Sequence, residues 1–253
     1  MCLILWRSQP DAAYPLVLMA NRDEFYARPT QPAGWWADHP GIYGGRDLVA
    51  GGTWLAMSTL GRWAALTNIR DLARFDPAAP SRGALITNYL IGAGSAAVYI
   101  EQLRAAGTPY NGYNLLLGDG PQVWHYNNYA DAASQVVAGV HGLSNATLNT
   151  PWPKVVRGKA KLAALAKANP LTPAPFFNAL GDLEPAPDAQ LPETGVGLEK
   201  ERLLSPMFIK MAEYGTRCST VLLFRHDGNV TFAEQTHADG RTRIEHIQLP
   251  RFT

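Results

Sequence analysis

The chain has 253 residues and a formal net charge of +1, from 22 basic and 21 acidic side chains. This balance gives no general affinity for polyanions, so no nucleic-acid partner is expected. No stretch approaches the roughly 20 apolar residues of a membrane span, and the first apolar run is too short for a signal peptide. The two cysteines, Cys2 and Cys218, form no disulfide framework and suit a reducing compartment. We therefore expect a cytoplasmic protein with one domain over residues 1–253.

The first two predicted strands form a hairpin that ends in a polar cluster. Apolar runs at 2–6 and 16–20 flank a turn-rich loop, which predicts an antiparallel pair. If Arg7 faces Leu16, Cys2 lies opposite Asn21, give or take one residue. Directly opposed residues have Cβ atoms about 5 Å apart. Cys2 is therefore expected beside the run Asn21-Arg22-Asp23-Glu24.

Cys2 combines a thiol with a free α-amine once Met1 is removed, an arrangement used by N-terminal nucleophiles. The amine titrates near pH 8 and can take up a proton at about neutral pH. The thiol needs nearby cations that favour its thiolate. Arg22 can supply that charge, and Asp23 can hold the amine or orient Arg22. The alternative interpretation is a solvated strand end whose ion pair contributes little.

Further elements follow along the chain. Helices are predicted at 83–91, at 96–106 with Ser95 as N-cap and Gly107 as stop, and at 153–168 with Pro153 in its first turn. Apolar runs at 2–6, 16–20 and 221–224 show no polar alternation, which indicates sheets that are covered on both faces. The proline-rich segment 169–192 is expected to be an ordered surface excursion. A turn at 226–229 is expected to join the two final strands.

Several conspicuous side chains favour ordinary structural roles. The third predicted helix is basic and is expected to present a solvated face, although such a face can also attract phosphates or propionates; its cations are Lys154, Arg157, Lys159, Lys161 and Lys167. The scattered histidines lack the spacing of metal ligands, so no protein metal site is expected. The sequence leaves open a role for His141 as an axial ligand of haem. Cys218 is expected to act as a small hydrophobe in a buried strand.

Seven sequence blocks, in order along the chain, resemble those of the NRDE family. They are Met1–Cys2, Asn21–Tyr26, Gly51–Leu55, Ala64–Asn68, Asn111–Leu115, Gly142–Ala146 with Thr150–Trp152, and Tyr214–Arg217. The resemblance implies an α+β fold of the N-terminal-nucleophile hydrolase type, a four-layer αββα sandwich of two antiparallel sheets. The enzymes of similar pattern are the choloylglycine hydrolases and penicillin V acylases, which open amides with Cys2.

The resemblance also implies roles for particular residues. Cys2 corresponds to the nucleophile with Arg22 and Asp23 beside it, Asn145 to the oxyanion donor, Asn68 to a second donor or orienting group, and Arg217 to a late arginine. Asn21, Glu24, Trp54 and Asn114 are expected to contact the ligand. In the acylases the aspartate lies three residues beyond the arginine, whereas Asp23 follows Arg22 directly. A regular strand points such neighbours to opposite faces.

Two functions from different classes are compatible with these residues. The first is hydrolysis of an amide or thioester bond in a small molecule, with Cys2 as nucleophile and no required cofactor. The second is a non-catalytic protein that binds and traffics haem or acyl-CoA or lipid in the same cleft. In that case Arg22 and Arg217 would meet an anionic group of the ligand.

Overall fold

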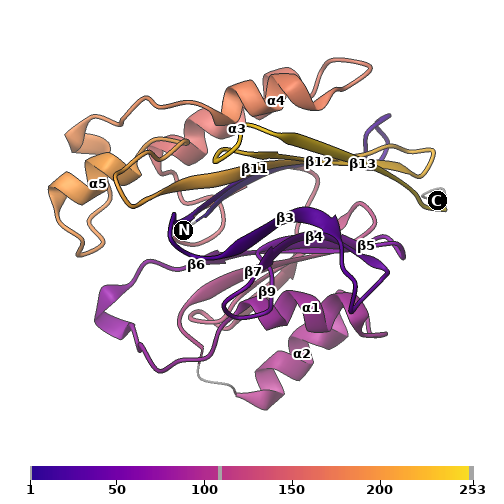
Figure 1. Ribbon diagram of the computed structural model, residues 1–253, viewed down its shortest axis with the longest axis horizontal. Helices are drawn as coiled ribbons and strands as arrows, with labels where there is room; N and C mark the ends of the chain where they lie inside the picture. Colours follow the sequence, from indigo (N-terminus) through magenta and orange to yellow (C-terminus); the bar gives the residue numbers. More distant parts are fainter. Residues whose placement is uncertain (1, 108–109, 251–253) are drawn as a thin grey trace.

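The computed structural model describes residues 2–107 and 110–250, and in these residues two antiparallel sheets lie face to face (Figure 1). The six-stranded sheet of the described chain has the order β10 (Gly139–Leu143), β1 (Cys2–Ser8), β2 (Leu16–Phe25), β11 (Tyr214–Phe224), β12 (Asn229–Thr236) and β13 (Thr242–Gln248). The seven-stranded sheet has the order β3 (Thr30–Trp35), β4 (Ile42–Asp47), β5 (Leu55–Ser58), β6 (Arg62–Asn68), β7 (Tyr113–Asp119), β8 (Gln122–Asn127) and β9 (Ala132–Gln135).

Helices cover the outer face of each sheet and complete four layers (Figure 1). Helices α3 (Pro153–Leu165) and α4 (Pro173–Leu180) pack on the six-stranded sheet, and α1 (Gly83–Ile91) and α2 (Ala96–Ala106) pack on the seven-stranded sheet. A short α5 (Leu198–Leu204) and the 3₁₀ turns Leu72–Arg74 and Asp188–Gln190 lie in connections. The α+β fold with αββα layers, which the resemblance implied, is confirmed.

Three apolar layers hold the sandwich together. Trp6 and Phe224 belong to the cluster between the sheets, Phe176 to the cluster under α3 and α4, and Tyr89 to the cluster under α1 and α2. Strand β1 therefore buries apolar side chains on both faces, which explains why its sequence does not alternate. Within the described residues, no helix is long and apolar enough to cross a membrane.

The register of the first hairpin differs from the prediction by one residue, within the margin given for it. Ser8 pairs with Leu16, so Cys2 pairs with Arg22 and not with Asn21. A slip of one residue exchanges the faces of a strand. Cys2 and Arg22 consequently share the face between the sheets, and Asn21 faces the helix layer.

A bulge in β11 changes the pairing beside Arg22. Thr216 pairs with Asp23 and Cys218 pairs with Arg22, so Arg217 is the extra residue between them. The bulge brings Thr216 to Asp23 on the helix side of the sheet and Cys218 to Arg22 on the inner side.

Other predicted elements are found with small differences. Both α1 and α2 have the predicted bounds; the Ser95 side chain accepts from the N–H of Val98, and Gly107 is left-handed. Helix α3 ends three residues earlier than predicted. The turn at 226–229 joins β11 to β12, but β13 follows, so these are not the final two strands. Strand β13 lies at the sheet edge with mostly exposed residues, and its sequence lacks the apolar run that marked the other strands.

Candidate functional site

Cys2 lines a pocket of about 150 Å³ to which both sheets contribute. The lining consists of Cys2, Arg22, Asp23, Glu24, Arg28, Asp47, Thr53, Trp54, Leu66, Asn68, Ser81, Arg82 and Gly83. Six of the predicted site residues therefore meet here, from four separate stretches of sequence. The pairing of β1 with β2 places the first four, and β6 with the segment before β5 supplies Asn68 and Trp54.

Arg22 is the buried cation nearest to Cys2 in the strand pairing. Only 5% of its surface is exposed. Its Nη1 donates to Thr30 Oγ1 at 3.0 Å, and its guanidinium lies 4.1 Å from the ring centre of Trp54. Such stacking is favourable because the ring face is electron-rich. Arg22 is thus held in place without a carboxylate partner among the described residues.

The groups around the Cys2 sulfur shift the pKa of the thiol in opposite directions. Burial raises the pKa of the thiol, and the nearby Asp23 carboxyl adds to that increase in pKa. Arg22 and the backbone N–H of Asp23, which donates to the sulfur, favour the thiolate. Because burial is the largest influence, the thiol keeps its proton near neutral pH unless a base removes it.

The carboxyl of Asp23 takes part in a buried polar cluster on the helix side of the sheet, although Asp23 also contributes to the lining of the Cys2 pocket. Asp23 is 1% exposed, and its Oδ1 accepts from Thr216 Oγ1 at 2.7 Å. Lys154, in the first turn of α3, donates from Nζ to the carbonyl of Leu204 at 2.9 Å. Burial lowers the pKa of Lys154 to about 8, against the attraction of Asp23. Burial raises the pKa of Asp23, and Lys154 opposes that rise.

The burial of Lys154 contradicts, for this residue, the prediction of a solvated basic helix face. Lys154 is 2% exposed, whereas the side chain of Lys161 is 41% exposed. The sequence did carry a signal for this difference, because Lys154 shares one helix face, at four-residue spacing, with the buried Gly158 and Leu162.

A hydrogen bond between Asn145 and Asn68 links the lining of a larger groove to that of the Cys2 pocket. Nδ2 of Asn145 donates to the backbone carbonyl of Asn68 at 2.8 Å. Asn145 lines the groove of about 710 Å³ together with Arg70, Trp152 and other residues, but it does not line the Cys2 pocket. This larger groove therefore adjoins the site that contains the thiol.

Asn21 and Asn114 lie outside the lining of the pocket, although both were expected to contact a ligand. Nδ2 of Asn21 donates to the carbonyls of Leu180 and Met207 at 3.0 and 2.8 Å. The side chain of Asn114 is fully buried, and its Nδ2 donates to the carbonyl of Ala146 at 2.7 Å. Both amides fasten the backbone of neighbouring segments.

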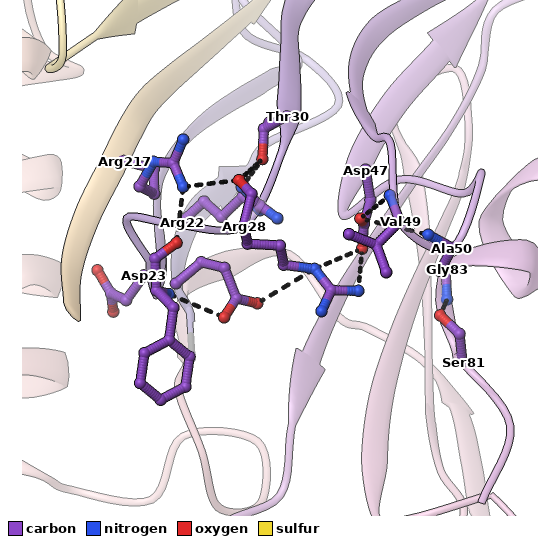
Figure 2. A network of polar contacts seen from close by, with 12 residues as sticks. Arg22, Asp23, Arg28, Thr30, Asp47, Val49, Ala50, Ser81, Gly83 and Arg217 are labelled. Atoms are coloured by element: carbon purple, nitrogen blue, oxygen red, sulfur yellow. Dashed lines mark hydrogen bonds and ion pairs between the residues drawn. The ribbon is translucent and has the colours of Figure 1, made fainter. Parts of the chain in front are cut away.

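Arg217 also differs from its expected place. Its Nη1 donates to the carbonyls of Phe25 and Arg28 at 2.7 and 3.0 Å, so it fastens the turn after β2 (Figure 2). It lines a second cavity of about 190 Å³ with Cys218 and Glu234 and does not line the Cys2 pocket. Cys218 is 4% exposed, as expected for a small buried residue.

The ring of His141 is engaged at both nitrogens. Nε2 lies 2.9 Å from the carbonyl of Val137, and Nδ1 lies 3.1 Å from Nδ2 of Asn149. The ring packs against Trp6 with centroids 5.3 Å apart. His141 therefore has a structural environment in this conformation, and among the described residues no cluster of side chains could hold a metal ion.

The sequence reasoning missed two arginines of the pocket. Arg28 binds Oδ2 of Asp47 through Nε and Nη2 at 2.9 and 2.7 Å (Figure 2). Arg82 lies directly before α1 and donates from Nη1 to the carbonyl of Gly112 at 3.3 Å. No motif marked them, because loops far apart in sequence bring them to Cys2.

Comparison with known proteins agrees with this architecture. The family model described as Transport and Golgi organisation 2 matches residues 1–239. The chain belongs to this family. The Transport and Golgi organization 2 homolog of Mus musculus is 34% identical over 274 residues, covering 100% of this chain and 99% of the homolog. The homolog of Homo sapiens is 36% identical over 260 residues, covering 94% of each. The predicted NRDE-family membership is thereby confirmed.

Among solved structures, the chain is similar to the C2A mutant of the conjugated bile acid hydrolase from Clostridium perfringens. The TM-score is 0.52 at 9% identity, with 97% of this chain and 92% of the other covered. At this identity the likeness concerns the fold. It agrees with the N-terminal-nucleophile hydrolase architecture expected of the family.

Proposed function

We propose that the protein is a cysteine hydrolase that opens an amide or thioester bond of a small molecule, with Cys2 as nucleophile. One observation carries the proposal: Cys2 and Arg22 are directly paired on the inner face of the sheet and line one small polar pocket with Asn68. A thiol that lines a cavity beside a buried guanidinium can reach a bound carbonyl and form a thiolate when needed.

The reaction begins when the Cys2 sulfur attacks the carbonyl carbon. The thiol proton passes to the free α-amine of Cys2, directly or through water, and then to the departing amine or thiol. Water finally cleaves the acyl–sulfur bond. This scheme requires removal of Met1, which lies outside the described residues, because a peptide-bonded nitrogen is not a base. A base is needed because burial raises the pKa of the thiol.

Asn68 is the better placed oxyanion donor of the two asparagines. It lines the pocket, whereas Asn145 lies behind it and holds its backbone carbonyl at 2.8 Å. In this proposal Asn145 acts as a positioning residue. Removal of one oxyanion donor typically lowers turnover by about 10²–10³-fold, so Asn68→Ala should do so and Asn145→Ala should act more weakly.

The proposal is tested by intact mass after incubation with the acyl donor p-nitrophenyl butyrate. The native protein should lack Met1 and gain one butyryl group. Cys2→Ala should neither gain that group nor release p-nitrophenol above the solvent rate, whereas the matched variant Cys218→Ala should do both. Release that survives in Cys2→Ala would exclude covalent chemistry at this thiol.

A second candidate is non-catalytic binding of haem or acyl-CoA or lipid, favoured by the groove next to the pocket. Its volume of about 710 Å³ lies in the range of small-molecule sites, whereas the Cys2 pocket is too small for such ligands. Trp152 offers an aromatic surface and Arg74 a cation. Saturable binding of hemin or palmitoyl-CoA that survives Cys2→Ala would support this function, and failure to bind either ligand would oppose it.

A further inference from the structure

Arg82 is a cation of the Cys2 pocket that the hydrolytic scheme leaves without a task. It lies before the first turn of α1 and lines the pocket with Cys2 and Arg22. Its hydrogen bond to the Gly112 carbonyl uses one of the five N–H donors of a guanidinium. The donors that remain can serve a ligand.

When Cys2 is in its thiolate form, Arg82 and the sulfur attract each other across the pocket. Burial lowers the pKa of Arg82, and the Cys2 thiolate is the first of the charges that oppose this effect. Figure 2 shows Ser81 and Gly83, which flank Arg82, on the side of the Arg28–Asp47 pair away from Arg22 and Asp23. Cations therefore enter the pocket from two separate segments, β2 and the segment before α1.

The carboxylates of the pocket are engaged by partners other than these two cations, although Glu24 also attracts Arg82 and Asp23 attracts Arg22. Asp47 is bound by Arg28 at 2.7 Å, and Glu24 lies 4.0 Å from the same guanidinium. The Asp23 carboxyl is engaged by Thr216 on the helix side of the sheet. Within the described residues, neither Arg22 nor Arg82 takes part in an ion pair. The pocket is thus suited to an anionic group beside the thiol.

We propose that Arg82 is a specificity residue that selects acyl donors carrying a carboxylate of their own, of about the size of a malonyl or succinyl group. The pocket volume of about 150 Å³ corresponds to about five water-sized groups, which limits the acyl part to a few atoms. In the bound donor, the carboxylate meets Arg82 while the carbonyl carbon faces the Cys2 sulfur. This proposal rests on the function proposed above.

A matched pair of alkylating reagents tests the charge preference without any turnover. Iodoacetate and iodoacetamide both transfer a two-carbon group to sulfur with loss of iodide, but only iodoacetate is anionic. Peptide mass spectrometry measures the rate constant of each reagent at Cys2. The rate constant of iodoacetate is divided by that of iodoacetamide, and this ratio in the native protein is compared with the ratio for the same thiol in the urea-unfolded protein. We expect the ratio of the iodoacetate rate to the iodoacetamide rate to be about tenfold higher in the native protein than in the unfolded protein, as one close cation without an ion-pair partner suggests.

Three variants assign the preference to Arg82. Arg82→Met should lower the ratio about tenfold, Arg82→Lys should keep most of it, and Arg104→Met, which removes a cation from α2 outside the pocket, should leave it unchanged. Thermal unfolding of each variant shows that the fold is intact. A native ratio no higher than the unfolded one, or an Arg82→Met ratio within twofold of the parent, would overturn the proposal.

The same variants separate this inference from the hydrolytic function. Succinyl and butyryl thioesters of N-acetylcysteamine are compared by thiol release. Preference for the succinyl donor that is lost in Arg82→Met supports both proposals. Equal turnover of the two donors by the parent refutes the selectivity and leaves the hydrolase intact. If neither donor is cleaved, the hydrolase loses support, and the alkylation ratio decides the charge preference independently.

Discussion

The two faces of β2 at its C-terminal end serve opposite purposes. On the inner face, Arg22 lies beside Cys2 at an open pocket and is held by a hydroxyl and an aromatic ring. On the helix face, Asn21 and Asp23 are about 1% exposed and are engaged by neighbouring side chains and carbonyls. Because side chains alternate along a strand, one face of this four-residue run points to the pocket, where the proposed chemistry takes place, and the other face anchors neighbouring segments.

This comparison indicates that activity and stability depend on alternate residues of the run. Inner-face substitutions should affect chemistry more than folding, because the groups they remove face a cavity. Helix-face substitutions should affect folding more than chemistry, because they leave buried polar groups without partners.

The strongest test of the inner face is Arg22→Met. Loss of the buried guanidinium beside the sulfur should lower turnover of the acyl donor by about 10²–10³-fold, comparable to loss of a preorganised donor. The free energy of unfolding should fall by only about 1–2 kcal/mol, from the lost stacking on Trp54. Steady-state kinetics and urea unfolding of the same sample measure both. Turnover within fivefold of the parent would show that Arg22 is not part of the chemistry.

The matching test of the helix face is Asn21→Ala. It leaves the carbonyls of Leu180 and Met207 without their shared donor and opens a small cavity, so the free energy of unfolding should fall by about 3 kcal/mol. Alkylation of Cys2 in the folded variant should change less than threefold. Asn88→Ala, on the exposed side of α1, serves as the control and should cost under about 0.5 kcal/mol. An Asn21→Ala protein as stable as the parent would remove the distinction between the two faces.

Much of the fold could be predicted because its signals are local. Apolar runs without polar alternation indicated sheets that are covered on both faces. Ser95 and Gly107 predicted where α2 begins and ends. Strand β13 escaped notice because a strand at the sheet edge needs no apolar run. The hairpin register could be predicted only to within one residue, because loop composition does not determine which residue closes the turn.

The sequence predicted a site residue correctly only where that residue lies in a local motif or in a pair of neighbouring strands. Cys2 and Arg22 meet because neighbouring strands pair, which a hairpin pattern can reveal. Arg82 reaches the pocket through the packing of α1 against the other sheet, and no local pattern encodes that contact. Arg217 matched a family block, yet a bulge turns it toward the carbonyls of Phe25 and Arg28.

Lys154 gives the helix face a pH dependence. Its pKa is about 8 in the folded protein and 10.5 as the reference value, so between these values the unfolded chain binds more protons. The free energy of unfolding of the parent, relative to Lys154→Met, should therefore rise with pH, by about 2 kcal/mol from about pH 7.5 to about pH 9.5. Urea unfolding across this range measures the difference. Lys161→Met, which removes a partly exposed cation of the same helix, serves as the control. If the difference for Lys154→Met does not change with pH, Lys154 is not desolvated.

The smallest effect is expected at the pair of Arg28 and Asp47, which borders the pocket on its partly exposed side. The two side chains are 31% and 15% exposed, so water weakens their attraction. A double-mutant cycle of Arg28→Met and Asp47→Asn should give a coupling energy of about 1 kcal/mol. Arg28→Met alone should also lower the iodoacetate preference of Cys2 about two- to threefold, because it leaves the Asp47 carboxylate uncompensated in the pocket. Asp47→Asn added to Arg28→Met should restore the preference. If it does not, the charge of Asp47 has no effect on alkylation at Cys2, and solvent screens charges in the pocket more strongly than the burial of the pocket residues suggests.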